Sequence, residues 1–298
     1  MALAHFTDAD LPDLAGRSVI ITGANSGIGR AAARVLARAG ASVTLAVRDV
    51  DKGEAAASSM SGTVSVRALD LADLGSVHTF ARGVREPFDI FIDNAGVMAV
   101  PKGRTADGFE RQIGTNHLGH FALTNLVLPL VRDRVVVVSS ELHRRGRIDL
   151  ADLNWERRRY RAWDAYAQSK LANLLFVTEL VRRLGAADSP VRALAVHPGY
   201  AATNLQNHTG RAATSLVMAI GNRLVAQSED MGALPTLYGA TMDVPGGSYV
   251  GPGGFRHLRG YPALGVPSTR ALDREMAARL WELSEKLTGV AWPLATTT

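Results

Sequence analysis

Cysteine is absent from the 298 residues of this sequence, which excludes disulfide bonds, cysteine-ligated zinc and a thiol nucleophile. No apolar run approaches the ~18 residues that a membrane-spanning helix needs. Residues 1–17 also lack the positively charged start and the apolar stretch of a secretory signal. From these absences we expect a cytoplasmic protein with no membrane span.

Lysine is scarce as well, because it accounts for 4 of the 33 basic residues and arginine supplies the rest. The net charge of +5 and the isoelectric point near 9.8 are values that nucleic-acid-binding proteins share. However, the basic residues are scattered along the chain except for two clusters, 143–147 and 157–161, and charge of this kind is typical of a solvated surface. We therefore expect no nucleic-acid partner, and salt-dependent retention on heparin would indicate the alternative.

Short apolar segments alternate with helical patterns, and no linker or composition break divides the chain. The strands are continuous apolar runs, such as Val135-Val136-Val137-Val138, which indicates a parallel sheet buried on both faces. We therefore expect a single α/β domain over residues 1–298, built on a doubly wound parallel sheet. The predicted strands are 18–22, 42–47, 64–69, 89–93, 134–139 and 191–196, and the predicted helices are 27–39, 74–84, 109–131, 166–184 and 271–287.

Three segments depart from this alternation. Residues 143–164 are polar and rich in arginine, and residues 200–227 combine polar positions with the apolar run 216–220. Both follow a predicted strand at its carboxyl end, where parallel sheets bind their ligands, so we expect both to shape a substrate pocket. The second segment also has the length of a mobile lid. Residues 243–267 are rich in glycine and proline and are expected to be loop-like.

Three glycines separate the first predicted strand from the first predicted helix, in Thr22-Gly23-Ala24-Asn25-Ser26-Gly27-Ile28-Gly29. One glycine allows a tight turn, another lets the backbone approach a pyrophosphate, and a third lets the helix pack closely on the strand. Backbone N–H groups at the start of the helix then bind the phosphates. The position at the first strand–helix junction favours a dinucleotide site, and an ordinary tight turn is the alternative.

Tyr166 and Lys170 lie four residues apart, which places them on one face of a predicted helix. A phenol alone has a pKa of ~10, too high for proton exchange at neutral pH. A neighbouring ammonium favours the phenolate and lowers this pKa. The alternative is an ordinary amphipathic helix in which the tyrosine packs and the lysine extends to solvent.

In their order and spacing these motifs resemble the short-chain dehydrogenase/reductase family, from about residue 15 to residue 203. The long gap between Ser140 and Tyr166, together with Gln168-Ser169-Lys170, resembles the retinol-dehydrogenase-like subgroup. This resemblance implies a Rossmann-like fold. It also implies hydride transfer between a nicotinamide cofactor and a carbonyl or an alcohol, and an apolar substrate.

The resemblance also assigns residues to cofactor binding. Asp93-Asn94-Ala95-Gly96 resembles the family's Asn-Asn-Ala-Gly, although an aspartate here replaces the first asparagine at a mainly structural position. The implied cofactor-binding residues are Gly23, Asn25, Ser26, Gly27, Ile28, Gly29, Asp70, Leu71, Asn94, Ala95, Gly96, Tyr166, Lys170, Pro198, Gly199 and Thr203.

Four residues receive catalytic roles from the same resemblance. Tyr166 exchanges the proton with the substrate oxygen, and Lys170 lowers the pKa of Tyr166 and holds the nicotinamide ribose. Ser140, rather than the adjacent Ser139, orients the substrate oxygen. Asn116 holds a water that links Lys170 to solvent. No histidine has carboxylates at a metal-ligand spacing, so we expect no metal site.

Arg48 decides the expected cofactor, because it follows the second predicted strand where the adenosine ribose binds. Its guanidinium can pair with a 2′-phosphate, and the subgroup carries arginine here, so we expect NADP rather than NAD. Asp49 is the counter-evidence, since a carboxylate at the ribose would repel that phosphate and favour NAD. A solvated Arg48 at a turn is a further alternative.

Two other functions fit the same fold. One is a dinucleotide-sensing regulator without catalytic activity, which the intact Tyr166, Lys170, Ser140 and Asn116 argue against. The other is an epimerase or dehydratase of nucleotide sugars, which the glycine spacing and the chain length disfavour. The resemblance also implies a small-molecule substrate and a homo-oligomer.

Overall fold

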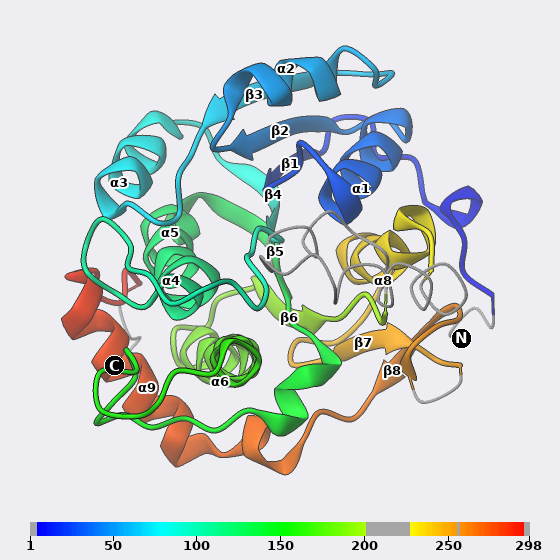
Figure 1. The fold of residues 1–298 in the computed structure, drawn as a ribbon. Helices are drawn as coiled ribbons and strands as arrows, with labels where there is room; N and C mark the ends of the chain where they lie inside the picture. The colour runs from blue at the N-terminus through cyan, green and yellow to red at the C-terminus, as the bar shows by residue number, and fades with distance from the viewer. Residues whose placement is uncertain (1–4, 201–226, 255–256, 295–298) are drawn as a thin grey trace, which may run out of the picture.

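The computed structural model describes residues 5–200, 227–254 and 257–294, which form an eight-stranded sheet (Figure 1). The strand order is β3-β2-β1-β4-β5-β6-β7-β8; β8 pairs antiparallel with β7, and every other pair is parallel. This confirms the expected doubly wound α/β fold. The strands are β1 (Ser18–Thr22), β2 (Ser42–Val47), β3 (Val64–Ala68), β4 (Phe88–Asp93), β5 (Val131–Val138), β6 (Arg192–Val196), β7 (Tyr249–Pro252) and β8 (Pro262–Gly265).

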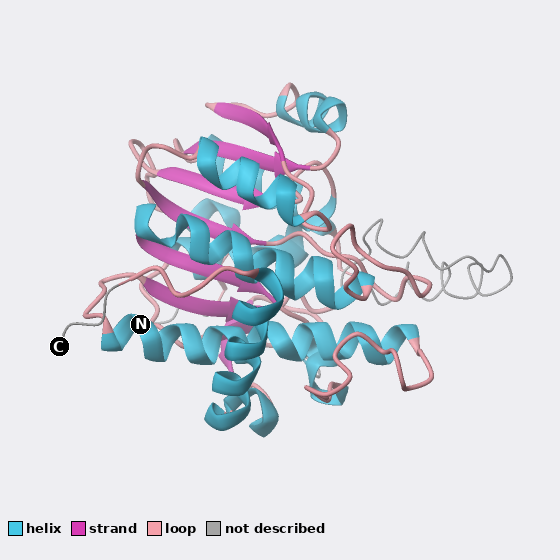
Figure 2. Ribbon diagram, turned by 90° about the vertical axis from the view of Figure 1, so that its left-hand side faces the viewer, coloured by secondary structure: helices cyan, strands magenta, loops and turns pink. Residues whose placement is uncertain are grey.

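Helices cover both faces of this sheet because its strands are apolar on both sides. In β1, Ile20 packs into the core on one face, while Val19 and Ile21 pack into the core on the other. Figure 2 shows the strands pointing toward one edge of the sheet, where the connecting loops gather. One face is covered by α1 (Gly27–Arg38), α2 (Val50–Ala57) and α8 (Glu229–Thr241). The other face is covered by α3 (Leu74–Gly83), α5 (Gly119–Val127) and α6 (Ala162–Ala186). Helix α9 (Arg274–Thr288) packs outside α5 and α6.

The stretch predicted as one helix over 109–131 is interrupted. It consists of α4 (Arg111–Ile113), a π-helical turn at Gly114–Leu118, α5 and a short 3₁₀ turn. Gly119 explains the close packing here, because a Cβ at this position would lie 2.3 Å from the carbonyl oxygen of Leu71. The π turn contains Asn116, so the irregular turn falls on a predicted site residue.

Two parts of the fold differ from the sequence-based expectation. Residues 243–267 were expected to be loop-like, but they contain β7 and β8, which continue the sheet beyond β6. The β-propensity of these glycine- and proline-rich strands is low, and sheet pairing supplies the order. Helix α8 escaped prediction because Gly232 through Ala240 are buried without an amphipathic pattern, and Pro235 lies inside the helix.

The arginine-rich segment 143–164 is ordered by one buried carboxylate. Asp152 accepts backbone N–H groups of Glu156, Arg157 and Arg158 at 2.7–3.1 Å. The Arg158 guanidinium also contacts this carboxylate at 3.1 Å and stacks 3.9 Å from the Trp155 ring centroid. The arginines of this segment therefore contribute to local structure.

Among the helices that the structure describes, none is long and apolar enough to cross a membrane.

An aromatic cluster attaches α9 to the rest of the molecule. The Trp281 ring stacks on the Phe176 ring with 5.5 Å between centroids, and it meets the Phe121 ring edge-on with 4.9 Å between centroids. His117 lies in the same layer, 3.0 Å from the Ser284 hydroxyl. Burial lowers the pKa of His117 to about 3, so this imidazole is neutral in the folded protein at neutral pH.

The buried neutral His117 predicts acid sensitivity. Its folded-state pKa lies below the unfolded value of ~6.5, so its stabilising contribution is complete above that pH and is lost as the pH falls toward 3. We expect His117→Gln to reduce the pH dependence of the unfolding free energy between pH 6 and pH 4 by up to ~1.4 kcal/mol per pH unit. Urea unfolding at several pH values measures this slope. The exposed His5→Gln is the control, and equal slopes in wild type and His117→Gln would contradict the prediction.

Candidate active site

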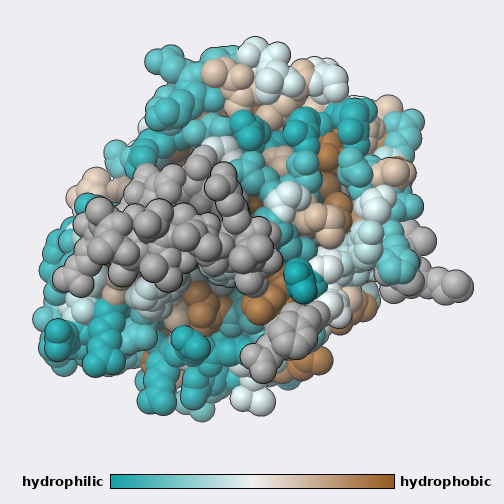
Figure 3. All heavy atoms as spheres, turned by 45° about the vertical axis from the view of Figure 1, so that its right-hand side comes forward, coloured by the Kyte–Doolittle hydropathy of each residue, from teal (hydrophilic) through white to brown (hydrophobic). Residues whose placement is uncertain are grey.

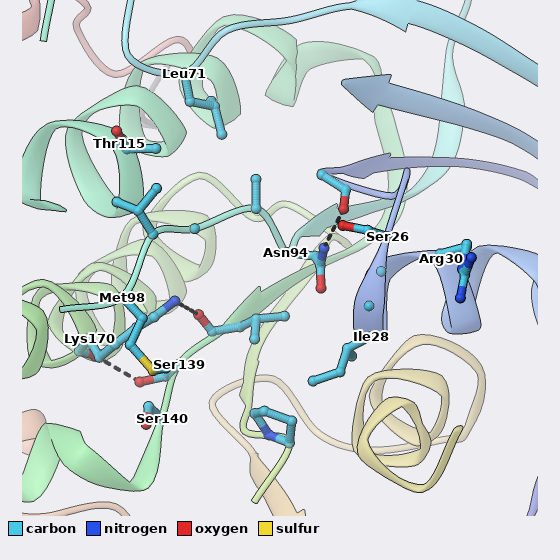
Figure 4. Close-up of a pocket in the computed structure, with 18 of the residues that line it drawn as sticks. Ser26, Ile28, Arg30, Leu71, Asn94, Met98, Thr115, Ser139, Ser140 and Lys170 are labelled. Carbon is cyan, nitrogen blue, oxygen red and sulfur yellow. Dashed lines mark hydrogen bonds between the residues drawn. The ribbon is translucent and has the colours of Figure 1, made fainter. Parts of the chain in front are cut away.

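A cavity of about 1400 Å³ opens at the carboxyl ends of the parallel strands, where Figure 4 shows part of its lining. Asn116 is not part of this lining, and Thr203 lies outside the described residues. Residues 201–226 of the segment 200–227, which was predicted to form a lid, also lie outside them. The predicted site residues that line the cavity are Gly23, Asn25, Ser26, Gly27, Ile28, Gly29, Arg48, Asp70, Leu71, Asn94, Ala95, Gly96, Ser140, Tyr166, Lys170, Pro198 and Gly199.

The glycine turn between β1 and α1 has the geometry that a bound phosphate requires. Gly23 and Gly27 have φ angles of +67° and +59°, which glycine adopts without strain. A Cβ on Gly29 would lie 2.3 Å from the side-chain nitrogen of Asn94. Ser26 does not cap α1 with its side chain, so the first N–H groups of the helix remain open toward the cavity. This turn therefore fits the pyrophosphate of a dinucleotide.

Asn94 and Thr22 hold this turn against the end of β4. The Thr22 hydroxyl accepts the backbone N–H groups of Asn94 at 3.0 Å and Ala95 at 2.9 Å. In return, the Asn94 side-chain amide donates to the Thr22 carbonyl at 2.7 Å. These bonds fix the two cavity walls relative to each other.

The far end of the cavity, beyond β2, is lined by the cations Arg48 and Lys52 and by the carboxylate of Asp49, which forms an ion pair with Lys52. Asp49 caps α2 by accepting the Lys52 N–H at 3.1 Å, and its other oxygen pairs with the Lys52 ammonium at 2.7 Å. Lys52 keeps the pKa of Asp49 below its ordinary value. Arg48 is exposed at the cavity and has no hydrogen-bonding or ionic partner among the residues described.

Tyr166 and Ser140 face each other at the opposite end. Tyr166 lies near the start of α6. Its hydroxyl faces the hydroxyl of Ser140, which accepts the Leu142 N–H at 3.2 Å. Ser139 is directed elsewhere, since its hydroxyl donates to the Lys170 carbonyl at 2.8 Å. Of the two serines, Ser140 is therefore the one whose hydroxyl is positioned beside the phenol.

The acidity of Tyr166 differs from the expectation. Burial raises the pKa of Tyr166 to about 12, although the Ser140 hydroxyl lowers it in part. The Lys170 ammonium lies 5.9 Å from the Tyr166 ring centroid and donates to the Val138 carbonyl at 2.9 Å. Burial penalises the charged phenolate, and this effect outweighs that of the Ser140 hydroxyl. The expected lowering of the Tyr166 pKa by Lys170 is not observed.

Asn116 lies behind the cavity wall and braces it. Its side-chain amide donates to the Val97 carbonyl and the Ser169 hydroxyl, both at 2.9 Å, and its side-chain oxygen accepts the Val97 N–H at 2.8 Å. The Asn116 carbonyl accepts from Nδ1 of His120 at 3.1 Å. These contacts give Asn116 a bracing function, and its predicted role in holding a water stays a prediction.

The apolar end of the cavity was not identified from motifs. Met98, Val100, Leu142, Trp163 and Leu258 are among the residues that line the cavity. The Trp163 ring meets the Tyr166 ring edge-on at 6.4 Å between centroids, and Met98 lies beside Lys170 and Ser139 (Figure 4). The signal in the sequence was the apolar run that follows Gly96, which no motif covers. Figure 3 shows hydrophobic patches on an otherwise largely hydrophilic face.

The segment 143–164 supports this apolar wall. The Tyr160 hydroxyl donates to the Val100 carbonyl at 2.9 Å, and the Gln112 side-chain oxygen accepts the Ala99 N–H at 2.8 Å. Gln112 in turn donates to the Tyr160 hydroxyl at 2.9 Å. Thus the predicted influence of this segment on the pocket is exerted through hydrogen bonds to the wall and through Arg144, Arg145 and Trp163, which line the cavity directly.

Comparison with known proteins gives consistent results. The family model for short chain dehydrogenases matches residues 17–213. Retinol dehydrogenase 13 of Homo sapiens is 42% identical, over 93% of this chain and 86% of its own length. Polyprenol dehydrogenase of Mus musculus is 41% identical, over 94% of this chain and 86% of its own length.

A solved structure agrees with these matches. The crystal structure of an uncharacterised protein from Mycobacterium Paratuberculosis is 56% identical, with a TM-score of 0.86, and the match covers 97% of this chain and 100% of that chain. Fold, cavity and sequence similarity all lead to one assignment. The chain belongs to the short-chain dehydrogenase family, and it is an NAD(P)-dependent oxidoreductase of that family.

Proposed function

We propose that this enzyme uses NADP(H) to interconvert apolar alcohols and the corresponding carbonyl compounds. The observation that carries the proposal is the lining of the cavity, which includes the apolar side chains of Met98 and Trp163 near Tyr166 and the cation Arg48 beyond β2 (Figure 4). The names of the relatives, a retinol dehydrogenase and a polyprenol dehydrogenase, support an apolar alcohol as the substrate class. A homo-oligomer and a cytoplasmic location remain predictions from the sequence.

The preference for NADP rests on the pair Asp49–Lys52. A free carboxylate at this position would repel a 2′-phosphate, but Asp49 is engaged by the α2 N-terminus and by the Lys52 ammonium. Arg48 is unpaired within the described residues and presents a planar fork of donors to the cavity. The local charge at this end therefore favours a phosphate over a ribose hydroxyl.

The chemistry at the other end depends on a proton and an oriented oxygen. When bound, the nicotinamide supplies or accepts the hydride. The Tyr166 hydroxyl gives its proton to the carbonyl oxygen during reduction and takes it back during oxidation. Ser140, whose hydroxyl faces that of Tyr166, orients the substrate oxygen beside it. The Lys170 ammonium lies 5.9 Å from the Tyr166 ring centroid, one helical turn further along α6.

The hydroxyl of Tyr166 is predicted to be essential for turnover. Tyr166→Phe removes the proton donor and keeps the ring, so we expect kcat to fall by ~10²–10⁴ while the Kd of the cofactor stays nearly constant. Steady-state kinetics and cofactor titration measure these two quantities. The control is Tyr261→Phe, which alters a tyrosine outside the cavity lining. Near-wild-type turnover by Tyr166→Phe would reject the assignment.

Arg48 is predicted to select the cofactor. Arg48→Ala should weaken NADP binding by ~1–3 kcal/mol, the scale of a charge-assisted hydrogen bond, and barely change NAD binding. Arg38→Ala removes the same charge outside the main cavity and serves as the control. Calorimetric titration with both cofactors tests this. Equal losses for NADP and NAD, or tighter NAD binding by the wild type, would refute the preference and leave the family assignment intact.

Because of the apolar side chains in the cavity wall, kcat/KM is predicted to be higher for longer apolar substrates. Each methylene that becomes buried contributes ~0.8 kcal/mol, so kcat/KM for straight-chain aldehydes should rise about fourfold per carbon until the cavity is filled. Met98→Ser should reduce this gain, because it places a hydroxyl in the wall. Kinetics with aldehydes of four to ten carbons, compared with terminally hydroxylated analogues, provide the test. A flat or falling series would contradict an apolar substrate.

A further inference from the structure

Asp93, the last residue of β4, is a wholly buried carboxyl group without an ionic function in the mechanism above. It precedes Asn94 and the cavity wall, in the position where the sequence departs from the family's asparagine. The Thr124 hydroxyl donates to Oδ2 of Asp93 at 2.8 Å. Its other oxygen, Oδ1, has no hydrogen-bond partner among the described residues. Such a buried, half-satisfied carboxyl group requires an explanation.

The hydrogen bonds around His120 define its protonation. Nδ1 of His120 faces the Asn116 carbonyl at 3.1 Å, which can only accept, so Nδ1 carries the proton. The Thr22 hydroxyl uses both lone pairs to accept N–H groups from Asn94 and Ala95. Its own proton has two acceptors within reach, the Ile92 carbonyl at 3.4 Å and Nε2 of His120 at 2.9 Å, and the shorter contact is the one to His120. His120 is thus a neutral imidazole whose Nε2 accepts a hydrogen bond.

This tautomer leaves two acceptors facing each other. Nε2 of His120 lies 3.7 Å from Oδ1 of Asp93, and neither atom carries a proton if Asp93 is ionised. Burial lowers the pKa of His120 to about 3, so the imidazole does not supply the missing proton. A proton on Oδ1 removes the repulsion between the two lone pairs. The geometry therefore favours a carboxylic acid at Asp93.

Lys170 is the nearby cation that responds to this carboxyl group. Burial lowers the pKa of Lys170 to about 8, and Asp93 acts in the opposite direction. Burial likewise raises the pKa of Asp93 to about 8, while Thr124 and Lys170 oppose that change. The other titratable group that faces Asp93 within the described residues is His120, and His117 lies beyond it, bonded to Ser284.

We propose that Asp93 is a positioning residue that holds a proton in the resting protein and releases it as the pH rises. The carboxylate then keeps the Lys170 ammonium charged beside Tyr166, so that the enzyme remains active in mildly alkaline solution. Oδ1–H dissociates to solvent, no bond between heavy atoms changes, and the pair Asp93–Lys170 becomes a neutral ion pair. The effect on turnover rests on the proposed function, whereas the protonation of Asp93 does not.

The protonation of Asp93 is tested by stability. A carboxyl group whose folded-state pKa lies above its unfolded value stabilises the protein at low pH and loses this contribution as the pH rises toward the folded pKa. The unfolding equilibrium constant of the wild type, divided by that of Asp93→Asn, should therefore increase about tenfold per unit between pH 5 and pH 7.5. Urea unfolding gives this ratio without any substrate or cofactor. A ratio that does not change with pH would overturn the proposal.

The effect on Lys170 is tested by the pH profile of carbonyl reduction. Without the Asp93 carboxylate, Lys170 loses its proton at a lower pH, so the alkaline limb of kcat/KM should move down by about one unit in Asp93→Asn. Thr124→Val keeps the carboxyl group but removes the hydrogen-bond donor to Oδ2 of Asp93. It should therefore move the alkaline limb of kcat/KM in the same direction by a smaller amount. This variant replaces Asp93→Asn if Asp93→Asn does not fold.

The control for the pH profile is Asp89→Asn, which removes a carboxyl group near the opposite end of β4, where Asp89 bonds to the N–H of Ser18 at 2.8 Å. Its kcat/KM should keep the wild-type pH profile. A purely structural role of Asp93 would lower kcat/KM equally at pH 7 and pH 9, and this result would refute the link to Lys170. If the wild type reduces no carbonyl compound, the proposed function fails, and the stability ratio still decides the protonation of Asp93.

Discussion

The hydroxyl of Thr22 joins three elements on which the cavity depends. It receives two N–H groups from the end of β4 and contacts the His120 imidazole of α5. Its two lone pairs are used by the two N–H groups, and its single proton is left for His120 Nε2 at 2.9 Å or for the more distant Ile92 carbonyl at 3.4 Å. The glycine turn that follows Thr22 and the wall that begins at Asn94 are therefore fixed relative to each other. The cationic and apolar ends of the cavity are built outward from this junction.

The sequence identified most of the sheet because burial on both faces leaves a strong local pattern. β1 and β2 were predicted with the bounds that the structure shows, and the glycine turn after β1 was recognised from its spacing. Many cavity-lining residues, such as those of the glycine turn, could be predicted because they lie where parallel strands end, whereas apolar lining residues such as Met98 and Trp163 were missed. Strands β7 and β8 could not be predicted, because glycine and proline hide their strand character and pairing with β6 provides it.

Protonation was the property that the sequence described least well. The spacing of Tyr166 and Lys170 gave their common helix face, but the pKa of each group follows from burial, which residue types do not reveal. The contacts of Asn116 with Val97 and Ser169 were hidden for a similar reason, since they join residues distant in the sequence and Asn116 lies in a π turn that residue types do not reveal. The supporting role of 143–164 likewise depends on distant partners such as Val100 and Gln112.

Tyr200 and Gln227, the residues that flank 201–226, are joined by a backbone hydrogen bond. The Gln227 N–H donates to the Tyr200 carbonyl at 2.8 Å, and the Tyr200 N–H donates to the Leu258 carbonyl at the same distance. Once a loop is closed at its base, doubling its length costs only about 0.6 kcal/mol of chain entropy. The number of residues between Tyr200 and Gln227 therefore has little effect on the entropy of this closure. A protein engineer can vary that number at small entropic cost, because the hydrogen bond between Tyr200 and Gln227 closes the chain whatever its length.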